Sequence, residues 1–303
     1  MTLKNITAII FCTLALVTQA AAQADSLLPA TLLSPGAVLN LISNRFTFTE
    51  GPAADRSGNI FFTDQPNDNI WEYDLTGRLT KYLQGTERSN GLYFGRAGQL
   101  VACADQDGRL VAFGPGKRKT ILLTGFHGKK FNGPNDCWVA PGGATYFTDP
   151  FYPRDYRNPQ QQAQESQSVY YLLPGRKSAM VADSTLKKPN GIVGTPDGHY
   201  LYVADIGDNK TYRYRITESG SLSDRQLFVN QGSDGMTIDE QGNVYLTGNG
   251  VTVYDAAGRK LGHIPVPAKW TANICFGGRD RKTLFITASE NIFTLAMSVK
   301  GTR

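Results

Sequence analysis

Six acidic or amide side chains recur along the chain at similar intervals, each followed by an apolar stretch and a turn. Their separations are 40, 45, 55, 44 and 39 residues. The six residues are Glu50, Asn90, Asn135, Asn190, Asp234 and Asn273. Carboxylate and amide oxygens are hard ligands that suit Ca²⁺ better than Zn²⁺ or Cu²⁺, because Ca²⁺ takes about 6–8 oxygen atoms. If the fold brings these side chains together, they predict a site for Ca²⁺, with other divalent cations as alternatives.

The residues around these positions form a repeated structural unit. Each copy has an apolar stretch, a turn and a strand-like run of alternating apolar residues, as in EGPAADRSGNIFFTD and NGIVGTPDGHYLYVAD. A third strand-like run follows, for example NIWEYD or KTYRYRI. Repeats of about 40–50 residues built from short strands are typical of propeller blades. With no long amphipathic helical pattern in the chain, the sequence predicts an all-β fold, a six-bladed β-propeller with four-stranded blades.

In a propeller, the first strand of each blade lines the central channel, so equivalent residues face one another across it. We therefore expect the six polar residues to meet at one end of the channel. Carboxylates gathered there without a cation would each cost roughly several kcal/mol of desolvation. Local turn chemistry is the alternative explanation for Asn or Asp before Gly. It does not explain Glu50, nor Asn135, which precedes Asp136.

A second regular set consists of the aspartates that end the second strand of the first four copies. They are Asp64, Asp105, Asp149 and Asp205. A carboxylate at this place can accept hydrogen bonds from the turn that leads to the third strand. We expect this capping role and no metal binding, because the corners of blades lie away from the axis.

The strings TEGP, NGPND, FTDP, KPNGI, DGM and NICFGG occur in this order and resemble the SMP-30/gluconolactonase family of calcium-dependent propeller lactonases. The resemblance runs from about residue 48 to residue 293. It implies four metal ligands, which map onto Glu50, Asn135, Asn190 and Asp234. It also implies that Asp234 is the general base and that Asn132 lines the substrate pocket. Some animal relatives carry an arginine near NGPND, where this chain has Gly133, so that arginine's substrate contact is not carried over.

The activity implied by the resemblance is hydrolysis of a sugar lactone, by attack of an activated water on a polarised ester carbonyl. Asn90 and Asn132 can donate to and accept from sugar hydroxyls. Asn273 and Trp270 belong to the inner segment of the last copy and are expected to shape the pocket, with ordinary packing favoured for Trp270. The alternatives are hydrolysis of another lactone or of an organophosphate ester, and a non-catalytic propeller in which calcium only rivets the channel.

Two local features bear on these alternatives. Glycines follow four of the six polar residues and are expected to leave room above the metal, which favours an enzyme; they are Gly51, Gly91, Gly191 and Gly235. The polar insert FYPRDYRNPQQQAQESQS follows FTDP and is a candidate lid over the site, with a disordered Gln-rich loop as the equal alternative. Asp136 is expected to orient Asn135 or to cap the local backbone.

Residues 1–24 have the features of a secretory signal peptide, with Lys4 before an apolar run and cleavage expected within Ala20–Asp25. The apolar run from Ile6 to Val17 is shorter than the roughly 20 residues that span a bilayer. We therefore expect a secreted or periplasmic protein with one propeller domain over residues 25–303 and no membrane partner after cleavage.

The charge and cysteine content exclude two other classes of function. The net charge is +5, but lysines and arginines form no stripe, so a nucleic-acid partner is not expected. Cys103, Cys137 and Cys275 lie in apolar runs without a C-x-x-C pair, which favours small buried residues over a zinc site or a thiol nucleophile. The expected partner is a small lactone substrate.

Overall fold

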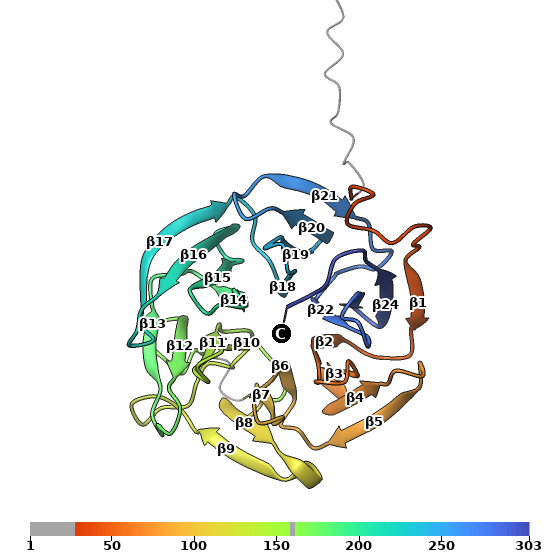
Figure 1. Cartoon of the computed structure of the whole chain (residues 1–303). Helices are drawn as coiled ribbons and strands as arrows, with labels where there is room; N and C mark the ends of the chain where they lie inside the picture. Colours follow the sequence, from red (N-terminus) through yellow and green to blue (C-terminus); the bar gives the residue numbers. More distant parts are fainter. Residues whose placement is uncertain (1–27, 158–160, 303) are drawn as a thin grey trace, which may run out of the picture.

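The computed structural model describes residues 28–157 and 161–302 of the chain. Within them, 24 strands form six antiparallel four-stranded sheets. The sheets are arranged like blades around a central channel (Figure 1). This architecture confirms the predicted six-bladed propeller with four-stranded blades. The predicted signal segment, residues 1–24, lies outside the described residues, and no helix among the described residues is long and apolar enough to cross a membrane.

Each blade runs from an inner strand at the channel to an outer strand at the rim. Blade 1 contains β2 (Thr49–Ala54), β3 (Ile60–Asp64), β4 (Asn69–Tyr73) and β5 (Leu79–Gln84). Blade 2 contains β6 (Ser89–Phe94), β7 (Leu100–Ala104), β8 (Arg109–Phe113) and β9 (Lys119–Leu123). Blade 3 contains β10 (Cys137–Val139), β11 (Thr145–Asp149), β12 (Ser168–Leu172) and β13 (Met180–Asp183). The first three copies of the sequence repeat therefore correspond to the first three blades.

The second half of the ring repeats this arrangement. Blade 4 contains β14 (Pro189–Gly194), β15 (Tyr200–Asp205), β16 (Lys210–Ile216) and β17 (Leu222–Val229). Blade 5 contains β18 (Met236–Ile238), β19 (Val244–Gly248), β20 (Gly250–Tyr254) and β21 (Lys260–Ile264). Blade 6 contains β22 (Asn273–Gly277), β23 (Thr283–Ala288), β24 (Asn291–Ala296) and, as its outer strand, β1 (Asn40–Ser43).

The ring closes within blade 6, because β1 comes from the beginning of the described chain and pairs antiparallel with β24, with Leu41 opposite Phe293. The two ends of the ring are thus joined by a β-ladder, which leaves no unpaired seam between the first and last blades. The sequence repeat did not reveal this strand, since NLIS lies before the first copy and lacks its pattern.

The apolar core lies between neighbouring blades, on the second and third strands. Strands β3 and β11 are buried along their whole length, including Phe62 and Phe147, which are fully buried. The outer strands, such as β17, carry mostly half-buried or exposed residues. Burying one such aromatic side chain stabilises the fold by about 1.5–3 kcal/mol. This packing fixes the blades relative to one another and so sets the positions of the inner strands.

The glycines after the polar residues allow adjacent inner strands to approach closely. A Cβ atom on Gly51 would lie 2.2 Å from the carbonyl oxygen of Asn90 in the next blade, and one on Gly235 would lie 2.0 Å from Cγ of Asn273. A Cβ on Gly191 would lie 2.6 Å from the carbonyl oxygen of Asp234. The expectation that these glycines leave room above a metal stays a prediction, and the contacts give them a further role. They leave room for the neighbouring blade.

The aspartates that end the second strands cap the backbone, but at a different place from the one expected. Asp149 accepts hydrogen bonds from the consecutive main-chain N–H groups of Asn132 and Gly133, at 2.9 and 2.8 Å. Asp64 and Asp205 bind the equivalent pairs, residues 47–48 and 187–188. These carboxylates therefore hold the segment that leads into the inner strand of their own blade. Asp105 is the exception, and binds a different segment, described below.

Candidate functional site

The six polar residues predicted to converge lie at the beginning of the six inner strands, or two residues before them. Glu50, Asn90 and Asn190 are each the second residue of a strand, and each lies at an irregularity in the pairing with the following strand. Such bulges redirect a side chain that would otherwise alternate with its neighbours. Asn135 and Asp234 precede the short strands β10 and β18. The inner strands thus bring all six residues to one end of the channel.

Hydrogen bonds connect the polar residues of different blades. Nδ2 of Asn190 donates to Oδ1 of Asp234 at 2.8 Å. Nδ2 of Asn273 lies 3.4 Å from Oε2 of Glu50 and 3.2 Å from Oδ2 of Asp136, so one amide bridges two carboxylates. Asp136 also accepts the main-chain N–H of Cys137, which is the backbone cap expected for it. The channel end is therefore a connected network of carboxylates and amides.

The carboxylates of this network are in an environment that disfavours their charged forms. Burial raises the pKa of Glu50 well above its usual range, and the negative charge of Asp234 raises it further. Burial also raises the pKa of Asp234 to about 6, although hydrogen bonds from Trp270 and Asn190 lower it. The pKa of Asp136 is raised by burial to about 7. A bound cation would reverse this penalty.

The amide oxygens give an independent test of whether a cation fits. Oδ1 of Asn90 and Oδ1 of Asn190 are buried and have no hydrogen-bond partner. An unsatisfied buried acceptor costs about 1–3 kcal/mol, which a metal ligand bond would remove. Among residues 28–157 and 161–302, no three His, Cys, Asp or Glu side chains form a metal cluster. A cation here would therefore depend on amide oxygens as well as on Glu50 and Asp234, a donor set that fits Ca²⁺.

Asn135 is held at the channel end by its backbone. Its main-chain N–H donates to the carbonyl of Thr148, and its carbonyl accepts the N–H of Gly91 from the neighbouring blade. It is 6% exposed. These contacts place Asn135 beside the network, as the sequence repeat predicted.

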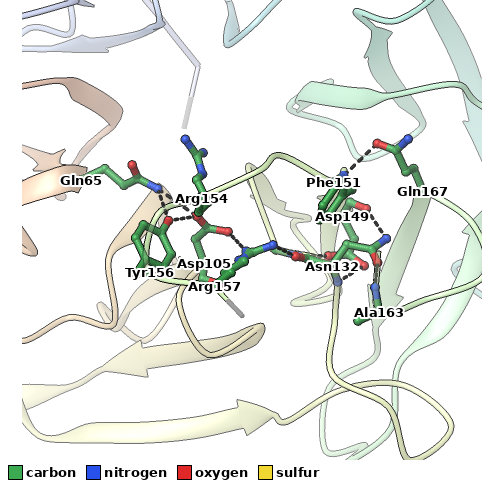
Figure 2. Close-up of polar contacts among 11 residues, drawn as sticks. Gln65, Asp105, Asn132, Asp149, Phe151, Arg154, Tyr156, Arg157, Ala163 and Gln167 are labelled. Carbon is green, nitrogen blue, oxygen red and sulfur yellow. Dashed lines mark hydrogen bonds and ion pairs between the residues drawn. The ribbon is translucent and has the colours of Figure 1, made fainter. Parts of the chain in front are cut away.

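Asn132 has a different role from the one expected. Its side chain is buried, and Nδ2 donates to the carbonyls of Asp149 and Ser166 while Oδ1 accepts the N–H groups of Ala163 and Gln164. Figure 2 shows the contacts of Asn132 with Asp149 and with Ala163 in the connection between β11 and β12. Both polar atoms of its side chain are occupied by main-chain groups. Asn132 therefore holds the insert in place, and the prediction that it contacts substrate is not supported by its position.

Tyr152 and Trp270 belong to the network, although the sequence did not predict a hydrogen bond for either. The hydroxyl of Tyr152, in the insert after β11, accepts a hydrogen bond from Nδ2 of Asn190 at 2.9 Å. Trp270 donates its indole N–H to Oδ2 of Asp234 at 2.6 Å and is 37% exposed, so ordinary packing does not describe it. The aromatic and basic composition of FYPRDYRN was the available sequence signal for Tyr152, but only the fold shows that the insert reaches the channel.

A cavity lies at the other end of the channel, away from the six polar residues. It has a volume of about 630 Å³ and is lined by the last residues of inner strands, including Ala54, Phe94 and Val139. None of the six polar residues lines it. The candidate site is therefore identified by its polar network and not by the size of a cavity.

Comparison with known proteins gives an independent indication of ancestry. Residues 48–290 match the SMP-30/Gluconolactonase/LRE-like region. The gluconolactonase of Zymomonas mobilis is 28% identical over 301 residues, covering 89% of this chain and 84% of that protein. The 6-deoxy-6-sulfogluconolactonase of Pseudomonas putida is 29% identical over 184 residues, covering 58% of this chain and 59% of that protein.

The structural comparison agrees with this result. A solved gluconolactonase from Xanthomonas campestris superposes with a TM-score of 0.80 at 28% identity, over 88% of this chain and 91% of that one. The family match covers most of the propeller and contains all six polar residues, from Glu50 to Asn273. The chain therefore belongs to the SMP-30/Gluconolactonase/LRE-like family.

Proposed function

We propose that this protein is a calcium-dependent hydrolase of sugar lactones. The observation that carries the proposal is the pairing of the buried carboxylate of Glu50 and the half-buried carboxylate of Asp234 with the unsatisfied amide oxygens of Asn90 and Asn190 at one channel end. Membership of a family that includes gluconolactonases supports the reaction class. Glu50, Asn135, Asn190 and Asp234 would hold the cation, and Asn90 and Asn273 lie beside them.

A bound Ca²⁺ would supply Lewis-acid polarisation of the lactone carbonyl. The chain's own residues would do the rest. Asp234 is the candidate general base, because Asn190 and Trp270 orient its carboxylate at both oxygens. Trp270, which is partly exposed, forms a wall beside this carboxylate. Tyr152 fixes the amide of Asn190 from the opposite side.

The proposal can be tested with a panel of sugar lactones assayed by acid release, with and without Ca²⁺. We expect turnover of at least one lactone, and loss of most of it after treatment with EGTA and recovery on adding Ca²⁺. Asp234→Asn should lower kcat by about 100-fold or more, since general bases contribute about 10²–10⁴-fold. Asp64→Asn, which changes a capping aspartate in blade 1, serves as the matched control.

Three outcomes would contradict different parts of the proposal. Full activity in EGTA would exclude the calcium requirement. Full activity of Asp234→Asn would exclude the base. Tight Ca²⁺ binding without turnover of any lactone would indicate a propeller in which the ion only stabilises the channel, the alternative that the sequence left open.

We also propose that the protein is exported. Support comes from the apolar run Ile6 to Val17 after Lys4, followed by small residues suited to cleavage. The test is to express the full chain and determine the N-terminal residue of the exported protein. We expect it to fall within Ala20–Asp25. Full-length protein confined to the cytoplasm would contradict the proposal.

A further inference from the structure

The segment after β11 forms a rigid arm, which we define as residues 151–157. It is anchored to blade 2 by Asp105, whose carboxylate accepts a hydrogen bond from Nε of Arg154 at 3.1 Å and is also bound by Arg157 and the hydroxyl of Tyr156 (Figure 2). Gln65 of blade 1 donates to the same carboxylate at 3.0 Å. The arm therefore crosses from blade 3 to residues of blades 1 and 2.

Asp105 can bind the arm because, unlike Asp64, Asp149 and Asp205, it does not cap the segment before the inner strand of its own blade. In blade 2, the N–H of Arg88 in the segment before the inner strand is bound at 2.7 Å by Asp68, a residue of blade 1. The carboxylate of Asp105 is 5% exposed and serves the arm instead. A buried carboxylate that binds a loop indicates that the fold specifies the position of this loop.

The arm places a guanidinium group near the candidate site. Arg154 contacts Asp105 through Nε, and Figure 2 shows the end of its side chain projecting away from Asp105. Its guanidinium carbon lies 5.4 Å from the centre of the Tyr152 ring, and Tyr152 contacts the metal-site residue Asn190.

Three basic side chains lie at the arm, near Asp105 or the ring of Tyr152. Two guanidinium groups, those of Arg154 and Arg157, share the one carboxylate of Asp105. Nζ of Lys188 lies 4.6 Å from the centre of the Tyr152 ring. A divalent cation would offset the charges of Glu50 and Asp234, so Arg154 would then face a site whose acidic charge is largely neutralised. Such a site favours a ligand with a negative charge of its own.

We propose that Arg154 is a specificity-determining residue that binds a carboxylate on the substrate, so that the preferred substrate is a sugar lactone carrying a carboxylate. This inference rests on the proposed lactonase function and names its substrate class. A planar guanidinium suits a carboxylate, because it can donate two parallel hydrogen bonds. The carboxylate takes no part in the ring opening, so Arg154 acts on substrate binding and not on the bond that breaks.

The test compares two lactones of the same ring size in Ca²⁺, a neutral aldonolactone and an aldarolactone that carries a carboxylate. We expect the wild-type protein to have a kcat/KM at least about tenfold higher for the aldarolactone. Arg154→Gln should lower that value by about 10- to 100-fold, mainly by raising KM, because hydrogen bonds to charged groups contribute about 1.5–3 kcal/mol. Hydrolysis of the neutral lactone should change by less than about threefold, and Arg154→Lys should retain part of the preference.

Arg88→Gln is the matched control, because the guanidinium of Arg88 packs on the ring of Tyr156 at 4.6 Å and so touches the same arm away from Tyr152. It should leave the preference unchanged. A second readout needs no turnover: binding of the open dicarboxylate sugar acid, measured by calorimetry, should weaken about tenfold or more in Arg154→Gln.

Equal kcat/KM values for the two lactones in the wild-type protein would overturn the inference. An equal loss of kcat/KM for both lactones in Arg154→Gln would also overturn it, because Arg154 would then act on both substrates alike. If the wild-type protein hydrolyses neither lactone, the proposed function fails, and the calorimetric comparison still decides whether Arg154 binds a carboxylate. Thermal unfolding of each variant checks that it is folded.

Discussion

Trp270 donates its indole N–H to Oδ2 of Asp234 at 2.6 Å, while Asn190 donates to Oδ1 of the same carboxylate at 2.8 Å. The candidate base is thus held at both oxygen atoms, from blade 4 on one side and from the segment before blade 6 on the other. A carboxylate fixed in this way cannot rotate freely. This arrangement gives Asp234 a defined direction in which to accept a proton.

Removing the indole N–H should therefore weaken catalysis while leaving the fold intact. Trp270→Phe keeps an aromatic ring but loses the hydrogen bond to Asp234, so we expect kcat/KM for the preferred lactone to fall by roughly 10- to 100-fold. Steady-state kinetics in saturating Ca²⁺ measures the effect. Trp71→Phe is the control, because the buried N–H of Trp71 has no hydrogen-bond partner. An equal loss in both variants would argue against the hydrogen bond as the cause.

The anchor of the arm should matter for stability. Asp105→Asn removes a carboxylate that is 5% exposed and binds two arginines, so we expect a loss of about 3 kcal/mol in the free energy of unfolding. Trypsin should also cleave faster after Arg154 and Arg157. Urea unfolding and limited proteolysis provide the measurements. Asp208→Asn removes a surface partner of Lys187 and Lys210 and is the control, which should leave the urea midpoint and the cleavage rate nearly unchanged.

The close approach of neighbouring inner strands predicts a strong position dependence for glycine substitution. In Gly235→Ala the new Cβ would lie 2.0 Å from Cγ of Asn273, the amide that bridges Glu50 and Asp136. We expect a loss of about 1–3 kcal/mol in stability and weaker Ca²⁺ binding. Gly142→Ala has no atom within 4 Å of its Cβ and should be nearly neutral. Similar melting temperatures for the two variants would contradict this account.

Asp149 should make stability depend on pH in a defined direction. Burial raises its pKa to about 7, against the hydrogen bonds from Gly133 and Asn132, which lower it. Because the folded-state pKa is above the usual value of 3.8, its contribution to stability is fully present below about pH 4. It is lost as the pH rises through about 7, by up to about 4 kcal/mol.

The measurement is the free energy of unfolding between pH 4 and pH 8, in saturating Ca²⁺ so that the metal-site carboxylates remain bound. Asp149→Asn should have a shallower decline than the wild-type protein over this range, although it is less stable overall because one capping acceptor is lost. A steeper decline in the variant would show that the carboxyl of Asp149 titrates in the opposite sense.

Much of the fold and part of the site were predictable because they depend on local patterns. The spacing between Glu50, Asn90 and their four counterparts corresponds to the length of one blade. It recurs because every blade must bury the same two faces of its sheet. The convergence of the six residues then follows from ring symmetry. The family resemblance, carried by strings such as TEGP and NICFGG, was confirmed by the match over residues 48–290.

Other parts of the site depend on contacts between segments that no local pattern connects. The sequence could not show that the side chain of Asn132 is hydrogen-bonded by the insert. Nor could it show that Tyr152 is hydrogen-bonded to Asn190, which lies 38 residues further along the chain. The role of Trp270 was misjudged because area alone favours burial of a large aromatic side chain, whereas its indole N–H binds Asp234 at a partly exposed position.

The sequence by itself determined the number of blades, the identity of the six polar residues and the hard-oxygen chemistry they share, because repetition and residue type are properties of the chain. The tertiary structure decided which oxygens remain unsatisfied, why glycines follow the polar residues, and where Arg154 lies. The physical reason is that these properties arise from close packing between blades, where a single Cβ atom or one carboxylate such as Asp105 changes which groups can meet.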